Sequence, residues 1–399
     1  MVADADADVP GRSPSGSPAA AQAERRLRWS SVTAGVGDGV VAVALPLLAA
    51  RLSADPLRVA AVVAAQHLPW VLVSLLWRRI GGDRRTVLGL VDTARAMILG
   101  LVGIAVVLGQ DTLNVLFVAA FAVGLGEALT DSAETETEDV SGLSARGMVG
   151  LAAVGLPLGG LLYEAFPATP FLFDVLAFTL ASTLVLAVAD PRVAPPVEEE
   201  LPEGRPSVAR AGWLTIAAVA AGSLATSAVL GVLVLFALHD LGLGAPAFGL
   251  LLAGLATSTA VGGFVAPEIG HVLGVRTGLV VALLFAAVGN VAAAMIADDT
   301  FPWLSAVALG VTAAAGMVAA VLGRAHLQHL TPTRPRAAVT DLLHRVSWAA
   351  IPVGALAGGA LASATSVRTT VLAAAGVWLL GALCATSASA QVRESREIG

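Results

Sequence analysis

Long apolar stretches recur along almost the whole chain and limit what it can fold into. Each is about 20 residues long, the length of helix that crosses the ~30 Å hydrocarbon core of a bilayer. Lipid offers no hydrogen-bond partner to the backbone, so each stretch is expected to form an α-helix. The sequence therefore predicts an all-α membrane protein with twelve spans. They are residues 29–50, 59–77, 87–108, 113–133, 147–166, 171–189, 212–238, 247–267, 277–296, 302–323, 341–363 and 369–389.

The composition excludes several other classes of protein. Of the 399 residues, 13% are charged and 57% hydrophobic, and the mean hydropathy is +0.83. A soluble domain carries about 25% charged residues. A disordered chain, a nucleic-acid-binding protein with a basic face and an ordinary cytosolic enzyme are therefore excluded. Nothing in the sequence resembles a catalytic site.

No cofactor or metal site is expected. The chain contains no Lys, so the phosphate-binding loop Gly-x-x-x-x-Gly-Lys-Ser/Thr cannot occur. Cys384 is the single cysteine, which excludes a disulfide framework and a multi-cysteine metal site.

A polar stretch in the middle divides the chain into two halves. Residues 190–211 contain Pro195-Pro196, the run Glu198 to Glu200 and three Arg residues, which is typical of a linker. Residues 29–189 and 212–389 then each hold six spans. Residues 1–28 lack the apolar core of a signal peptide and are expected to form a disordered tail. Residues 390–399 are expected to form a second tail.

The arginines indicate how the chain lies in the membrane. All 23 basic residues are Arg, and with the N-terminus inside, 19 of them fall on cytoplasmic segments. Only Arg51, Arg58 and Arg368 fall on outer segments, and Arg95 lies within a span. Cytoplasmic loops of membrane proteins carry an excess of basic residues. We therefore expect a multi-pass protein of the cell membrane with both termini in the cytoplasm.

The two halves look like copies of one another. Pro157 of the fifth span and Pro352 of the eleventh lie 195 residues apart, each within a glycine-rich segment. Small residues let helices approach closely and Pro allows bending, so these segments are candidates for hinges or for plain packing. Two six-span repeats in the same orientation are the architecture of the major facilitator superfamily. The residues of the two segments are Gly155, Pro157, Gly159, Gly160, Pro352, Gly354, Gly358 and Gly359.

Three motifs of the first half are more specific. They read Gly37-Asp38-Gly39 in the first span, Asp92-x-x-Arg95-Ala96 in the third and Gly124-x-x-Glu127-x-Leu129-x-Asp131 in the fourth. In this order and spacing they resemble the drug and siderophore exporters of the superfamily, of the enterobactin-exporter and macrolide-efflux type. The resemblance covers nearly all of residues 29–389. It implies the major facilitator fold, with twelve transmembrane helices in two pseudo-repeated halves, and drug:proton antiport.

The loop between the second and third spans departs from the superfamily pattern Gly-x-x-x-Asp-Arg. It reads Gly81-Gly82-Asp83-Arg84-Arg85, so the basic cluster is present. Either Asp83 is the acidic residue of a shortened loop, or Ile80 occupies the position of that residue. The resemblance makes Asp83, Arg84 and Arg85 the candidates for an inner gate.

Five charged residues inside spans of the first half are the candidates for a functional role: Asp38, Asp92, Arg95, Glu127 and Asp131. A charge within the bilayer costs ~2.5–3.5 kcal/mol on insertion scales, so a charged residue in a span is expected to have a partner or a function. Low dielectric favours the neutral form of a carboxylate, whereas a neighbouring Arg favours the charged form. If the Arg changes partner during a conformational cycle, a carboxylate can take up and release a proton.

The alternative for these charges is a static salt bridge between the third and fourth spans, with Asp92 or Glu127 as the partner of Arg95. Asp38 has no evident partner in its own span and lies near the middle of the membrane. We therefore interpret Asp38 as a proton-coupling carboxylate.

The second half is nearly free of charge within its spans. Asn290 is its main deep polar side chain, and Trp70 and Trp348 lie close to Pro69 and Pro352. We expect Asn290, Trp70 and Trp348 to line a substrate cavity. Trp213 and Trp303 lie near span ends, where tryptophan is typical of the membrane interface.

These features favour a secondary active transporter that exports a small, largely apolar compound, of the drug or siderophore class, in exchange for protons. The bilayer surrounds it, and we expect it to be monomeric. One alternative is a non-transporting relative that serves as a membrane scaffold or sensor. Another is an importer of the same fold.

Overall fold

The computed structural model describes residues 18–76, 84–110, 112–134, 154–186, 208–331 and 336–397. In these residues the regular structure is helical, and α8 continues into a short π-helix, η3 (Phe236–Asp240). The twelve α-helices described are α1 (Pro18–Leu52), α2 (Pro56–Leu76), α3 (Arg84–Val107), α4 (Leu113–Glu134), α6 (Leu156–Ala165), α7 (Thr169–Leu186), α8 (Arg210–Leu235), α9 (Ala245–Leu273), α10 (Val275–Met295), α11 (Pro302–Leu330), α12 (Arg336–Ala364) and α13 (Val367–Glu397).

Eight of these helices, α1, α2 and α8 to α13, are long and apolar enough to cross a membrane. Helices α3, α4 and α7 contain shorter apolar stretches at 93–107, 113–129 and 169–184. Large apolar side chains also cover the outside of the bundle, and Phe264 and Leu176 are 85% and 70% exposed. Such side chains suit a lipid environment, because water would penalise them. The expectation of an all-helical membrane protein is confirmed.

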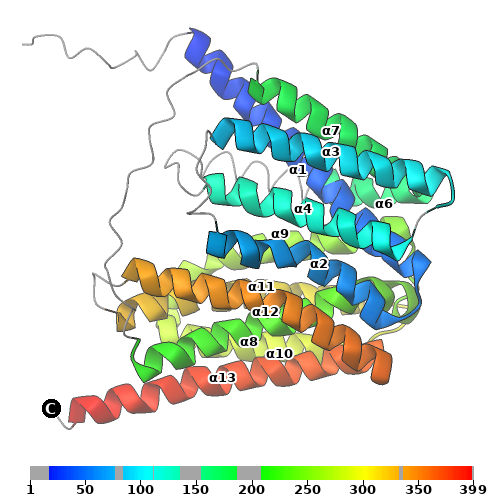
Figure 1. The fold of residues 1–399 in the computed structure, drawn as a ribbon. Coiled ribbons are helices and arrows are strands. Elements are labelled where there is room, and N and C mark those ends of the chain that lie inside the picture. The colour runs from blue at the N-terminus through cyan, green and yellow to red at the C-terminus, as the bar shows by residue number, and fades with distance from the viewer. Residues whose placement is uncertain are drawn as a thin grey trace, which may run out of the picture.

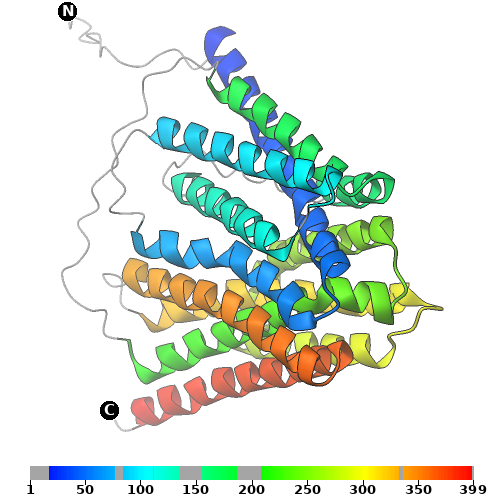
Figure 2. The same cartoon turned by 45° about the vertical axis from the view of Figure 1, so that its right-hand side comes forward.

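Two groups of helices pack side by side (Figures 1 and 2). In the first group, α1 packs on α6 and α7, α3 packs on α4 and α7, and α2 packs on α4. In the second, α8 packs on α12 and α13, α10 on α11 and α13, and α9 on α11. We call α1 to α7 the N-terminal group and α8 to α13 the C-terminal group.

Helices α2 and α6 connect the two groups, since α2 packs along α12 and α6 packs on α9. A Cβ atom added to Gly160 of α6 would lie 2.9 Å from the Cα of Pro246 at the start of α9. A Cβ added to Gly359 of α12 would lie 3.0 Å from the Cα of Leu57 at the start of α2. At both places the backbones are too close for a larger residue.

The first residues of α1 and the last residues of α13 lie at one end of the bundle, on the left of Figure 1. We call this end the terminal face and the other end the opposite face. The close contact of α2 with α12 at Gly359 and that of α6 with α9 at Gly160 both lie toward the opposite face. Toward the terminal face the N-terminal group diverges from the C-terminal group, as α1 and α7 show in both views (Figures 1 and 2).

Hydrogen bonds add to the connection at the opposite face. Ser363 Oγ of α12 donates to Asp55 Oδ1 at 2.6 Å. The backbone N–H of Leu57 donates to Ser363 Oγ at 2.9 Å. The turn before α2 is therefore bonded directly to the last turn of α12.

The helices extend beyond the expected spans at both termini. Helix α1 begins at Pro18, within the segment 1–28 that was expected to be disordered, and α13 continues to Glu397. Hydropathy marks only the apolar part of a helix. Ala19 to Ala21 and their neighbours have high helix propensity but are not apolar enough in sum to count as a span.

Several expected features lie outside the described residues. Most of the linker 190–211 does, as do the residues before Val154 in the fifth span and Asp83 of the expected inner gate. Arg84 and Arg85 begin α3, but their side chains are not described.

Candidate functional site

A buried ion pair joins α1 and α3. Arg95 of α3 is 3% exposed, and its Nη2 pairs with Oδ1 of Asp38 of α1, which is 30% exposed. Gly126 of α4 lies beside the stem of Arg95, since a Cβ there would lie 3.3 Å from its Cδ. Asp38 is therefore a direct partner of Arg95, a pair that the spacing along the spans did not indicate. Spacing within one helix cannot show a contact between two helices.

Asp174 of α7 lies on the same arginine. Its side chain is completely buried, and it interacts electrostatically with Arg95. A Cβ added to Gly37 would lie 2.7 Å from Asp174 Oδ1, so only glycine leaves room for this carboxylate beside Asp38. One turn further along α7, the Phe178 ring lies 4.2 Å from the Cζ of Arg95, a cation–π contact.

Glu127 of α4 completes the cluster. It interacts electrostatically with both Arg95 and Asp38. Its closest described hydrogen bond comes from an uncharged side chain: Gln66 Nε2 of α2 donates to Glu127 Oε1 at 3.4 Å. We call Asp38, Arg95, Glu127 and Asp174 the ion cluster.

The ion cluster carries an excess of acidic groups. Among the described side chains, one guanidinium interacts with three carboxylates that come from three different helices. A buried carboxylate without a full counter-charge is costly unless it binds a proton or a cation. In the described residues, no group of three or more His, Cys, Asp or Glu side chains is arranged to hold a metal ion. Such a cluster can exchange protons when its geometry changes.

The two tryptophans expected in the cavity are in direct contact. The rings of Trp70 on α2 and Trp348 on α12 stack with centroids 4.2 Å apart and an interplanar angle of 11°. This contact joins the N-terminal and C-terminal groups, which lie far apart in sequence.

Asn290, by contrast, does not face an open cavity. It is completely buried in α10, a helix that packs on α9, α11 and α13. The prediction that Asn290 lines a cavity rested on its polarity and depth, which do not fix the direction of a side chain. Asp92 and Asp131 lie on α3 and α4, but their side chains are outside the described residues.

The glycine-rich segments pack helices closely. Gly155 and Gly159 of α6 lie on Val36 and Val40 of α1. Gly354 and Gly358 of α12 lie in the same way on Leu224 and Ala228 of α8. Pro157 stands in the first turn of α6, and Pro352 is buried inside α12. These contacts favour the packing interpretation of the two segments.

Sequence reasoning missed two members of the site, Asp174 and Gln66. Asp174 is the fourth residue of the sixth expected span, and an acidic residue within a span is the signal that identifies the other charged candidates. Gln66 gave no such signal, because a single amide in an apolar span is common.

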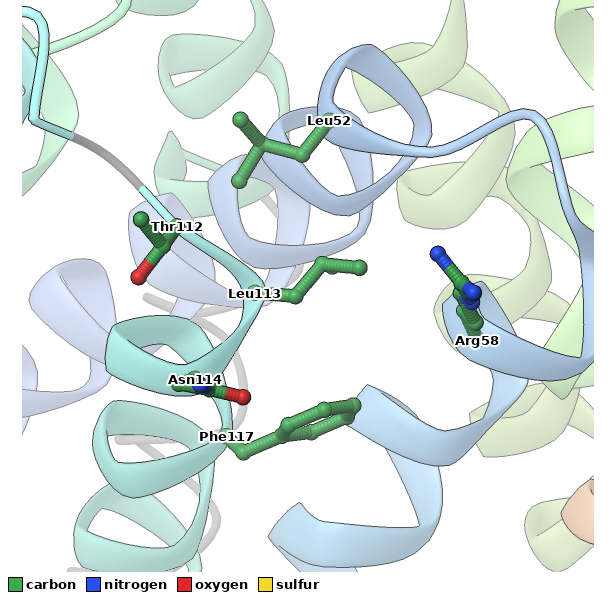
Figure 3. Close-up of a pocket in the computed structure, with 6 residues that line it drawn as sticks. All are labelled: Leu52, Arg58, Thr112, Leu113, Asn114 and Phe117. Carbon is green, nitrogen blue, oxygen red and sulfur yellow. The ribbon is translucent and has the colours of Figure 1, made fainter.

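A cleft of about 430 Å³ opens elsewhere, at the opposite face of the N-terminal group (Figure 3). It lies between the end of α1, the start of α2 and the start of α4, and the side chains of Arg58, Leu113 and Phe117 project into it (Figure 3). It is remote from the ion cluster. Its lining residues are Leu52, Arg58, Thr112, Leu113, Asn114 and Phe117.

Several solved structures have the same fold. A bacterial homologue of the iron transporter ferroportin, in an inward-facing state, superimposes with a TM-score of 0.74 at 15% identity, covering 92% of this chain and 99% of that chain. The nucleoside transporter NupG gives 0.70 at 14% identity, covering 92% and 98%. A bacterial homologue of the lysosomal transporter Spinster, inward-facing and occupied, gives 0.70 at 14% identity, covering 94% and 97%.

A family model gives the assignment that these distant structures cannot give alone. Residues 14–398 match the model of a family described as transmembrane secretion effector. No curated protein matches the sequence significantly. The match spans almost the whole chain, and the similar structures are transporters of the same fold. The chain therefore belongs to the transmembrane secretion effector family of the major facilitator superfamily, and it is a multi-pass membrane transporter and not an enzyme.

Proposed function

We propose that this chain exports a small, largely apolar compound in exchange for protons, by alternating access. The observation that carries the proposal is the ion cluster, in which three carboxylates, one of them completely buried, interact with the buried Arg95. A static structural network gains little from an unbalanced excess of carboxylates. A proton carrier needs such an excess, because one carboxylate must be neutral in part of its cycle.

The architecture proposed with this function is two six-helix halves related as repeats, residues 29–189 and 212–389. The packing supports it, because α6 packs on α1 and α9 while α12 packs on α8 and α2. The fifth span thus contacts the first of its own half and the eighth of the other. The eleventh span contacts the seventh of its own half and the second of the other half. If the two halves are repeats, the first corresponds to the seventh and the second to the eighth, so the two sets of contacts are equivalent.

An inward-facing state is proposed for the arrangement described. The two helix groups are joined at the opposite face and diverge toward the terminal face, which carries most of the arginines. If the terminal face is cytoplasmic, the two groups diverge on the side of the cell interior. The state is the one in which an exporter loads its substrate.

The chemistry of the substrate is proposed from the side chains of the C-terminal group. Helices α8 to α13 contribute mainly apolar side chains, and Trp348 supplies an aromatic surface at α12. The drug and siderophore class fits such a wall, in line with the resemblance to the enterobactin-exporter and macrolide-efflux branch.

The test is proton flux driven by substrate in proteoliposomes, across a panel of apolar drugs and siderophores. Wild type should move protons against one compound or class of compounds. Asp38→Asn and Glu127→Gln keep the size of each side chain but cannot titrate, so both should lose uphill transport. Counterflow exchange of substrate, which needs no proton movement, should survive in both variants.

Two outcomes would contradict the proposal. Uphill export at the wild-type rate by Asp38→Asn and Glu127→Gln would remove the ion cluster from the coupling. Substrate flux without any proton movement in wild type would mean that the transporter uses another energy source.

A further inference from the structure

Gln66 and Trp70 of α2 lie on one face of the helix, because they are four residues apart. Gln66 binds Glu127 of the ion cluster, and Trp70 stacks on Trp348 of the C-terminal group. One helix face therefore carries both a contact to a titratable group and a contact across the two helix groups.

The contact between α2 and α4 at Gln66 is very close. A Cβ added to Gly124 of α4 would overlap the backbone carbonyl of Gln66. Glu127 lies three residues after Gly124, so its side chain and Gln66 meet where the two helices lie very close together. A change in the Glu127–Gln66 hydrogen bond is therefore expected to displace the backbone of α2.

Trp70 is held between α4 and α12. On one side it packs against the apolar cluster of Val73, Ala128 and Leu129, together with Leu125. On the other side it stacks on Trp348. Ala128 directly follows Glu127. The same turn of α4 therefore carries the Glu127 carboxylate and part of the apolar cluster that packs against Trp70.

We propose that Gln66 is a positioning residue that transmits the protonation of Glu127 through α2 to the Trp70–Trp348 contact. This inference rests on the proposed proton coupling and names the route from the cluster to the second half. An ionised Glu127 accepts a charge-assisted hydrogen bond from Gln66 Nε2, which ties α2 to α4. A protonated Glu127 weakens that bond, so α2 is released from α4 and shifts against α12.

Glu127 is the carboxylate suited to this role. Asp38 is paired directly with Arg95, and Asp174 is sealed from solvent against Gly37. Glu127 is partly exposed and bonded to a neutral amide. It can thus exchange a proton at lower cost than the other two.

The groups that face Glu127 fix what a pH titration reports. They are Arg95 from α3 and Asp38 from α1. His67 follows Gln66 on α2, and its Nδ1 lies 2.9 Å from the carbonyl oxygen of Val63. Asp131 lies one helical turn after Glu127 on α4, and Asp92 lies one turn before Arg95 on α3. A Glu127→Gln variant therefore has to accompany every measurement, so that an effect of Glu127 is separated from one of His67.

The experiment measures the distance between α2 and α12 in the purified full chain without substrate. Spin labels are attached to Leu72→Cys and Val353→Cys, two exposed positions, in a Cys384→Ala background. Between about pH 8 and about pH 5 the distance should shift by roughly 2 Å or more, the scale of helix movements at interfaces. The shift should be lost in Glu127→Gln and in Gln66→Leu.

Gln328→Leu is the matched control, because Gln328 is an exposed glutamine near the end of α11. It should keep the full pH-dependent shift. If Gln66→Leu does not fold, Trp348→Leu tests the same route from α12, and it too should lose the shift.

A shift that persists in Gln66→Leu or Trp348→Leu would overturn the proposed route, and so would a wild-type distance that does not change with pH. These outcomes are separate from those of the transport assay. A proton-coupled exporter with a pH-independent distance retains its function and loses this route. A pH-dependent distance without proton-coupled transport refutes the function and leaves a conformational effect of Glu127.

Discussion

Among single residues, Arg95 is the side chain shared by all three carboxylates of the ion cluster. Arg95→Ala would leave Asp38 and Asp174 without their counter-charge in a buried site. Removing one partner of a buried ion pair costs roughly 3–5 kcal/mol of stability. We expect a clear fall in the melting temperature of the purified protein in detergent.

The control for Arg95 is Arg58→Ala. Arg58 is 67% exposed and lies 3.5 Å from Asp55, so its loss should cost no more than about 1 kcal/mol. Equal melting temperatures for Arg95→Ala and wild type would mean that the ion cluster does not contribute to stability as described.

At the scale of helices, the contact between α6 and α9 depends on Gly160. A Cβ at this position would overlap the carbonyl oxygen of Ala245, and backbone atoms cannot move aside as a flexible side chain can. Overpacking of this kind costs about 1–3 kcal/mol. Gly160→Ala should therefore shift the protein about tenfold or more toward the state that is open at the opposite face.

A reporter for this state is Val63→Cys, which is 9% exposed in the α2–α12 contact, in a Cys384→Ala background. Its rate of reaction with a maleimide should rise in Gly160→Ala. In the control Gly254→Ala the rate should not change, because an added Cβ there meets nothing within 4 Å. Unchanged labelling in Gly160→Ala would show that the α6–α9 contact is not part of the closure.

The hydrogen bonds between α2 and α12 at the opposite face have a defined pH dependence. The Ser363 hydroxyl, and then the Leu57 N–H, lower the pKa of Asp55 below its usual range. A group whose pKa is lowered stabilises the bonded state above its ordinary pKa, about 3.9 for Asp, and loses this effect as the pH falls through the lowered value. The hydrogen bonds of Asp55 are therefore insensitive to pH across the physiological range.

Asp55→Asn should raise the labelling rate of Val63→Cys, because the amide is a weaker acceptor than the carboxylate. The ratio of the two rates should stay constant from about pH 8 to about pH 5. A ratio that falls between about pH 7 and about pH 5 would mean that Asp55 titrates in that range and that the pKa direction is wrong.

At the scale of the whole molecule, the sequence predicts the helices well and their contacts poorly. Hydropathy predicts the helices because lipid leaves the backbone no alternative to internal hydrogen bonds. It did not predict the start of α1 at Pro18, where propensity and not apolarity extends the helix. The Arg95–Asp38 pair and the direction of the Asn290 side chain were not predicted, because both depend on how helices are rotated about their axes, which no single span reveals.

The orientation of the molecule in the membrane is a separate prediction, carried by the arginine distribution. The terminal face should be cytoplasmic, because 19 of 23 arginines fall on the segments that the sequence predicts to be cytoplasmic, and basic loops stay inside. In a Cys384→Ala background, Ser207→Cys in the linker should be protected from a membrane-impermeant maleimide in intact cells. Thr300→Cys, in the turn between α10 and α11 at the opposite face, should react at once. Reaction of Ser207→Cys from outside with protection of Thr300→Cys would reverse the orientation. The ion cluster would then face the external medium in this state, and the loading step of an exporter would have to be assigned to the other conformation.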